Sequence, residues 1–178
     1  MGELRRTRIK SYRLDSEILQ RLNVASKRAG KAENAFISEL IEERLAIDPL
    51  IPAFSEIRMT SSTFQSILNA SNIDSLEATA SEVAQKNVQL AFELFRSNGR
   101  TIDFEGFVTT ILGRYARWFY IEGNANLAHG SVTLRHEYGL KWSRFLKAYL
   151  VSASTILQGG KLDIKTSDQF VRLGLSKF

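Results

Sequence analysis

A short basic stretch of alternating polarity near the start of the chain constrains the fold most. Residues 8–14 read Arg-Ile-Lys-Ser-Tyr-Arg-Leu. Successive side chains of a strand point to opposite faces, so Tyr12 and Leu14 are expected to share the side suited to a core. The opposite side, suited to a groove, would carry Ile9, Ser11 and Arg13. The stretch therefore predicts an amphipathic β-strand.

Two amphipathic helical patterns follow this strand. Asp15 or Ser16 can cap the first helix, in which Ile18, Leu19 and Leu22 recur at helical spacing. Gly30 is suited to a left-handed stop. The second helix is predicted to begin at Asn34, a good capping residue, and to end at Asp48-Pro49. Its apolar positions are Phe36, Ile37, Leu40, Ile41 and Leu45.

This N-terminal module is too small to be stable alone. A lone short strand has no pairing partner, and two helices of this length bury little surface. Pairing with the same strand of a second chain solves both problems, so the sequence predicts a homodimer. The sequence leaves open whether the homodimer assembles further into a tetramer.

Charge is distributed unevenly along the 178 residues. Residues 1–31 carry a net charge of +6, residues 32–50 carry −4 and the remainder carries +3. A cationic end beside a near-neutral body predicts that a polyanion docks at the N-terminus. The three arginines before the strand, Arg5, Arg6 and Arg8, are expected to form a flexible arm that grips phosphates.

The composition excludes several classes of protein. The chain has no cysteine, which rules out disulfides, thiolate metal sites and cysteine nucleophiles. No segment approaches the apolar length of a membrane helix, and no apolar stretch follows the N-terminal arginines as in a secretory signal. We therefore expect a cytoplasmic protein with no membrane partner.

Residues 5–46 resemble the ribbon-helix-helix family, the fold of the methionine and Arc repressors. The resemblance rests on the ribbon ending in Arg13-Leu14, the first helix, Gly30 and the second helix. It implies that a two-stranded ribbon from two chains enters the major groove of double-stranded DNA. The base contacts it implies are Ile9, Ser11 and Arg13, with Arg13 suited to guanine.

The same resemblance implies a phosphate anchor on the amides that begin the second helix. These amides belong to Glu33, Asn34 and Ala35. Asn34 stands where the family usually has a hydroxyl residue, and Lys10 stands at a ribbon position that is more often apolar. The expected phosphate contacts are Arg5, Arg6, Arg8, Lys10 and Asn34.

The body of the chain, residues 53–178, predicts an α+β domain with a small antiparallel sheet. Residues 53–72 are ambiguous between strand and helix. Asp74-Ser75-Leu76-Glu77 is a capping-box pattern that opens a helix ending at Asn98-Gly99, and Asp103 can cap the next. The remaining predicted elements are strands at 118–122 and 130–135, a helix at 140–158 and one or two strands after Leu162.

No catalytic or metal site is predicted in this body, and no cofactor. The two histidines are His129 and His136, and the adjacent pair His136-Glu137 would point opposite ways on a strand. No phosphate loop or nucleophile motif is present, so we do not expect an enzyme.

The turn from the second strand into the long helix admits two interpretations. It could line a small-molecule pocket or a partner surface, through Arg135, His136, Tyr138 and Lys141. Alternatively, Trp142, Phe145 and Tyr149 belong to the core and the rest is a capped turn. The cluster Trp118-Phe119-Tyr120 is likewise expected to fill a core.

Together these observations predict a ribbon-helix-helix module at residues 1–48 and a sensor or oligomerisation domain at 53–178. The expected function is sequence-specific transcription regulation, such as repression, by a homodimer, with a small-molecule effector as a further partner. Alternatives are a DNA-organising plasmid partition or relaxation accessory protein, an antitoxin, and a protein-interaction module whose basic end never meets DNA.

Overall fold

The computed structural model describes residues 11–47, 59–97, 99–123 and 130–175. The chain divides into two compact units, residues 1–48 and 49–178.

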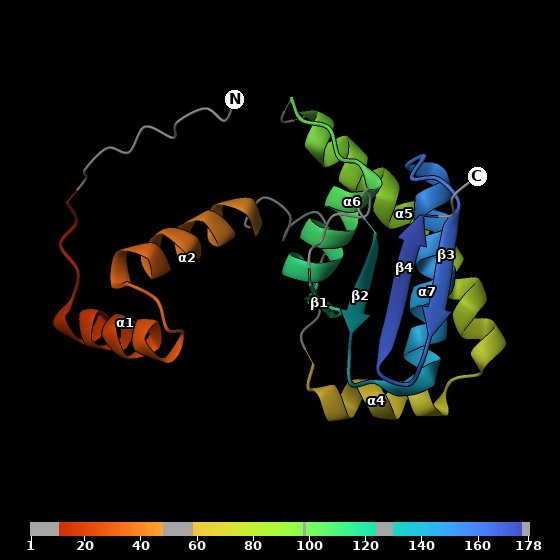
Figure 1. Ribbon diagram of the computed structural model, residues 1–178, viewed down its shortest axis with the longest axis horizontal. Helices are drawn as coiled ribbons and strands as arrows, with labels where there is room; N and C mark the ends of the chain where they lie inside the picture. Colours follow the sequence, from red (N-terminus) through yellow and green to blue (C-terminus); the bar gives the residue numbers. More distant parts are fainter. Residues whose placement is uncertain (1–10, 48–58, 98, 124–129, 176–178) are drawn as a thin grey trace. The chain divides into compact units, whose positions relative to one another are not determined.

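The first unit contains two helices, α1 (Ser16–Arg28) and α2 (Glu33–Ile47), which pack against each other (Figure 1). Asp15 caps α1, because its Oδ1 accepts a hydrogen bond of 2.8 Å from the Glu17 amide. Gly30 adopts a left-handed φ of 64°, and the Lys31 amide bonds back to the Ser26 carbonyl at 3.0 Å. The predicted cap and stop of the first helix are confirmed.

The start of α2 differs from the prediction by one residue. The helix begins at Glu33, and the carbonyl of Ala32 accepts the amide of Phe36 at 3.0 Å. Asn34 therefore lies inside the first turn, and the prediction that it caps the helix is wrong.

The predicted strand is not formed by residues 11–15 of the single chain, which carry no regular secondary structure. A strand requires backbone hydrogen bonds to a neighbour, and a solitary chain provides none here. Residues 8–10 of the predicted strand lie outside the described residues.

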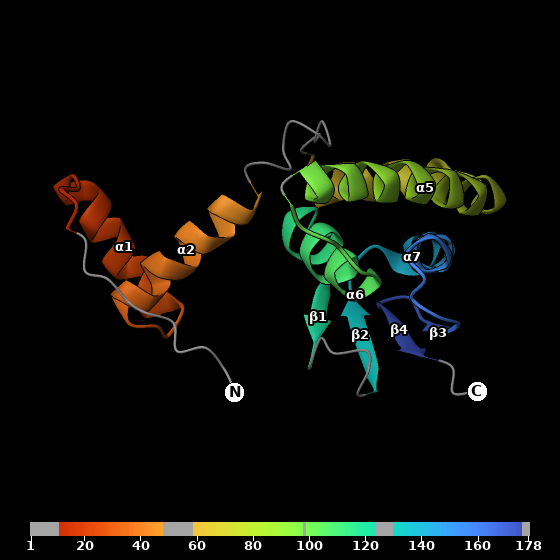
Figure 2. The ribbon, with the colours of Figure 1, turned by 90° about the horizontal axis from the view of Figure 1, so that it is seen from above.

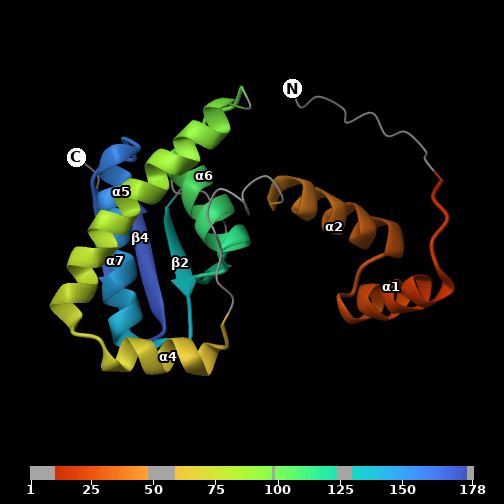
Figure 3. The same cartoon turned by 180° about the vertical axis from the view of Figure 1, so that it is seen from behind.

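The second unit is a mostly helical α+β domain, as predicted. Its elements are α4 (Ser61–Ala70), α5 (Ile73–Ser97), α6 (Phe104–Gly106), the π-helix η1 (Phe107–Tyr115), β1 (Tyr120–Glu122), β2 (Ser131–Arg135), α7 (Gly139–Ile156), β3 (Leu162–Thr166) and β4 (Phe170–Leu175). Figure 2 shows three layers: α5 outermost, then η1 and α7, then the sheet. Helix α4 lies across one end of α7 (Figure 3). It shows that the segment 53–72, which was ambiguous between strand and helix, is helical from Ser61 to Ala70.

The four strands form one antiparallel sheet in the order β1-β2-β4-β3. Side chains alternate between its faces. Those turned toward the helices are buried in the two central strands: Val132, Leu134, Val171 and Leu173. The small antiparallel sheet of the prediction is thus confirmed.

The core of this unit lies between the sheet and the two inner helices. Its largest fully buried side chains include Phe107, Leu112, Leu134, Leu146, Tyr149 and Leu150. Trp142 is also buried, and its Nε1 donates to the Trp118 carbonyl at 3.2 Å. Burying one such side chain contributes about 1.5–3 kcal/mol, so this unit has a substantial core of its own.

The aromatic cluster at residues 118–120 is divided between core and surface at the start of β1 (Tyr120–Glu122). Phe119 is buried, whereas the neighbouring Tyr120 leaves 78% of its surface exposed. The expectation that the whole cluster fills the core is therefore wrong for Tyr120, because its pairing with Arg135 places it on the face of the sheet opposite to the buried Leu134.

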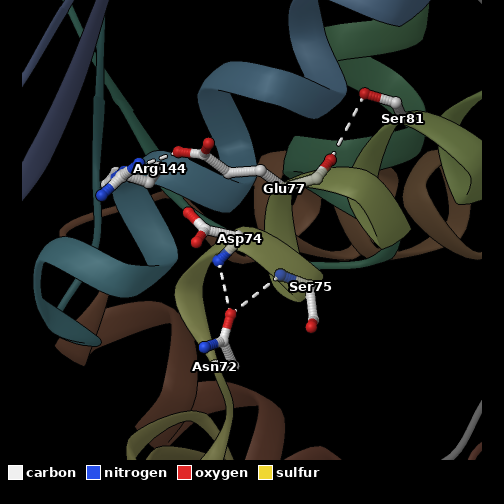
Figure 4. A network of polar contacts seen from close by, with 6 residues as sticks. All are labelled: Asn72, Asp74, Ser75, Glu77, Ser81 and Arg144. Carbon is white, nitrogen blue, oxygen red and sulfur yellow. Dashed lines mark hydrogen bonds and ion pairs between the residues drawn. The ribbon is translucent and has the colours of Figure 1, made fainter.

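The predicted capping box at the start of α5 is also wrong. Asn72 caps the helix instead, because its Oδ1 accepts from the amides of Asp74 at 2.9 Å and Ser75 at 3.2 Å (Figure 4). The carboxylate of Glu77 turns away and accepts from Arg144 Nε on α7 at 2.5 Å. The cap thus lies two residues before the predicted Asp74, and Glu77 links α5 to α7.

Within the described residues, no helix has the combination of length and apolar character that crossing a bilayer demands.

Candidate nucleic-acid interface

The segment before α1 presents its side chains to solvent in the single chain. Ser11 and Arg13, predicted to contact bases, are both exposed. Tyr12 and Leu14, predicted to face a core, are 73% and 43% exposed. The other predicted DNA contacts on this segment lie outside the described residues: Arg5, Arg6, Arg8, Ile9 and Lys10.

The beginning of α2 leaves its first backbone amides without partners inside the helix, as in every α-helix. Asn34 is exposed there, at the position where the family resemblance implies a phosphate. The neighbouring Glu33 is half-buried, and its carboxylate accepts a hydrogen bond of 3.3 Å from the side-chain Nδ2 of Asn23 on α1. Lys31 forms an ion pair with Glu39. Asn34 and the exposed Arg13 are thus both available to a ligand in this unit.

The first unit has little core of its own. Among its described side chains, only Ser26 is buried. Eight large apolar side chains remain between 43% and 73% exposed. We call them the uncovered apolar set: Tyr12, Leu14, Ile18, Leu19, Val24, Leu40, Ile41 and Leu45.

The packing of α1 on α2 also leaves a shallow open groove. The apolar residues Val24, Ala25 and Phe36 line it together with Arg21 and Arg28. Sequence reasoning missed Val24, which lies off the predicted stripe of α1. The available signal was a β-branched apolar residue among the polar positions of an amphipathic helix.

The four candidate residues at 135–141 differ in burial and in the partners that they contact. Arg135 is exposed on β2 and pairs across the strands with Glu122, with 2.9 Å between Nε and Oε2. Tyr138 is half-buried, with its ring edge-on to Phe64 and Trp142 at 5.0 and 6.1 Å between centroids.

His136 is buried, with only 4% of its surface exposed. Its Nε2 lies 2.7 Å from Ser143 Oγ, and its Nδ1 accepts from the Tyr138 amide at 3.3 Å. Ser143 Oγ in turn donates to the Ser167 carbonyl at 2.5 Å. Burial disfavours the charged imidazolium and lowers the pKa of His136 to about 4.

Lys141 serves the fold directly. Its Nζ donates to the carbonyls of Leu68, Asn69 and Ser71 at 3.2, 2.7 and 2.6 Å. These carbonyls lie at the C-terminal end of α4, where the helix dipole stabilises a cation. Lys141 therefore fixes α4 against α7.

Across the described ranges, no group of three or more His, Asp or Glu side chains is placed to hold a metal ion. His129 lies outside these ranges.

Comparison with models of protein families, with curated proteins and with solved structures found no match to this chain.

Proposed function

We propose that the protein is a homodimeric, sequence-specific DNA-binding regulator whose residues 1–48 pair with those of a second copy as a ribbon-helix-helix module. The observation that carries this proposal is the uncovered apolar set. A unit of this size that exposes eight large apolar side chains needs a covering surface. A second copy provides a self-complementary one.

Dimerisation also accounts for residues 11–15. Each chain contributes one strand, and the two strands satisfy each other's backbone groups in an antiparallel ribbon. Tyr12 and Leu14 then pack onto the helices. Burying a side chain that starts about half exposed contributes about 1 kcal/mol.

The opposite side of the ribbon would read DNA. The major groove admits a two-stranded ribbon, and the fork of Arg13 fits the two acceptors of guanine. Ser11 and Ile9 would complete the base contacts. Arg5, Arg6, Arg8, Lys10 and Asn34 would contact phosphates, which fix position without reading sequence.

The second unit would serve this module by further oligomerisation or by sensing an effector. The polar atoms of His136 and Lys141 are bonded within the fold, which disfavours ligand binding through these two side chains. A DNA-organising role in plasmid partition or relaxation would use the same module. An antitoxin is disfavoured, because its tail would be disordered until bound.

Selection of bound duplexes from a random pool tests the proposal. A palindromic or repeated motif is expected from a dimer. Arg13→Ala should relax the preference at one base position, at a cost of about 1–3 kcal/mol. Arg6→Ala should weaken all duplexes alike and reduce the salt dependence of binding. Lys86→Ala on α5 is the control, because this exposed cation pairs only with Glu82 among the described residues.

If Arg13→Ala and Arg6→Ala weakened binding to every duplex by the same factor, the assignment of Arg13 to the groove would be wrong. Absence of duplex binding at low salt would overturn the proposal as a whole.

A further inference from the structure

One face of the sheet has no covering layer among the described residues of the second unit. All the helices that contact the sheet lie on its other side, as Figure 2 shows. The buried central residues Val132, Leu134, Val171 and Leu173 point toward these helices. The alternate residues of the four strands therefore form an open surface, which we call the sheet face.

Two rings and a guanidinium form one row across this face. The strand register pairs Tyr120 with Arg135 and Arg135 with Phe170. Residues directly opposite in antiparallel strands share a face, and neighbouring strands are about 4.8 Å apart. The rings of Tyr120 and Phe170 thus start from positions about 10 Å apart. Tyr120 is 78% exposed, and Phe170 is half-buried.

Two cations stand in the next row, together with a threonine and a glutamate. Here the register places Glu122, Thr133, Arg172 and Lys165 side by side. The guanidinium carbon of Arg172 lies 6.0 Å from the centre of the Phe170 ring, and its Nε is 3.4 Å from Thr133 Oγ1. Within the described part of the chain, neither Arg172 nor Lys165 forms an ion pair, whereas Arg135 is held by Glu122.

We propose that the sheet face binds single-stranded nucleic acid. Bases stack on aromatic rings and on arginine guanidinium planes, and flanking cations hold the phosphates. Tyr120 is one stacking platform, and the pair of Phe170 and Arg172 is the next. Lys165 supplies a charge beside them. A duplex keeps its bases stacked inside and offers no free base planes to a flat surface, so unpaired strands are the preferred ligand.

This inference concerns the second unit and does not depend on duplex recognition by the first. It is tested on the full chain by fluorescence anisotropy with a labelled single strand of about 12 nucleotides. An abasic strand of equal length is the second probe, since it keeps the phosphates and lacks the stacking planes.

The double variant Tyr120→Ala with Arg172→Ala is expected to weaken single-strand binding about tenfold or more. Its matched control is Phe92→Ala with Lys86→Ala, which removes one half-exposed ring and one exposed cation from α5. The control should leave affinity within twofold of that of the native chain. The native chain should also bind the abasic strand about tenfold more weakly than the normal strand.

Equal affinity for the abasic strand, equal loss in both double variants, or no binding of single strands overturns the proposal. Arg13→Ala separates the two proposals, because it should impair duplex binding and spare single-strand binding. Loss of single-strand binding through Arg13→Ala alone would place that activity in the first unit and contradict the sheet face.

Discussion

His136 shows how one buried side chain couples the second unit to pH. Ser143 Oγ has one proton and donates it to the Ser167 carbonyl. It must therefore accept from His136 Nε2, while Nδ1 accepts from the Tyr138 amide. Both ring nitrogens are satisfied in this neutral tautomer. Protonation would place a proton on Nδ1, facing the proton of the Tyr138 amide.

We expect the second unit to lose stability between about pH 6.5 and pH 4. The folded state lowers the pKa of His136 from 6.5 to about 4, so the unfolded state binds the proton more readily in this interval. The contribution of neutral His136 to the free energy of unfolding is complete above pH 6.5, decreases as the pH falls and is lost near pH 4. Its size is about 3 kcal/mol at most.

Urea denaturation between pH 4 and pH 7 measures this effect. His136→Gln should be less stable at neutral pH and should show a shallower pH dependence than the native chain. Parallel pH profiles of the two proteins would assign the acid sensitivity to other groups.

Helix α5 illustrates, at the scale of elements, how a long-range contact can replace a local one. Its first amides are capped by Asn72, and its Glu77 is paired with Arg144 on α7. Asn72→Ala should therefore destabilise the second unit by about 1 kcal/mol. Ser75→Ala is the matched control, because this exposed side chain lies in the same helical turn. Thermal denaturation at neutral pH compares them.

The opposite result would contradict the Asn72 cap: if Asn72→Ala left stability unchanged and Asp74→Ala lowered it, the predicted capping box at Asp74 would be correct.

Helices and strands with strong periodicity were predictable from the sequence, and their partners were not. The cap of α1, the stop at Gly30, the span of α7 and the alternation in β2 follow from local residue chemistry. The pairing of Glu77 with Arg144, 67 residues away, could not be predicted, because no local pattern reports such a contact. The exposed Tyr120 could have been found by applying strand alternation to residues 118–122.

The candidate sites were likewise predictable only where they depend on residue type and charge. Residue type and charge identified the exposed Arg13 and Asn34 as candidates, and their DNA contacts stay predictions. The roles of His136 and Lys141 in the fold could not be predicted, because they depend on Ser143, Ser167 and the end of α4, which only the tertiary structure brings near.

In the intact protein, the apolar side chains of the first unit need a covering surface. Ile41 is 50% exposed on α2, whereas Val151 is 46% exposed on α7 of the second unit. A charge placed in a buried dimer interface is strongly unfavourable. Ile41→Glu should therefore yield monomers that no longer bind duplex DNA, as measured by light scattering and anisotropy. Val151→Glu should preserve both dimerisation and binding, and equal behaviour of the two variants would contradict this location of the interface.

The most direct test is the mass of the native chain in solution, measured by sedimentation equilibrium over a range of micromolar concentrations. A dimer that forms through residues 1–48 predicts twice the chain mass of 20.1 kDa, or a larger even multiple of it. A single species of 20.1 kDa at every concentration would contradict the shared ribbon and the DNA recognition built on it.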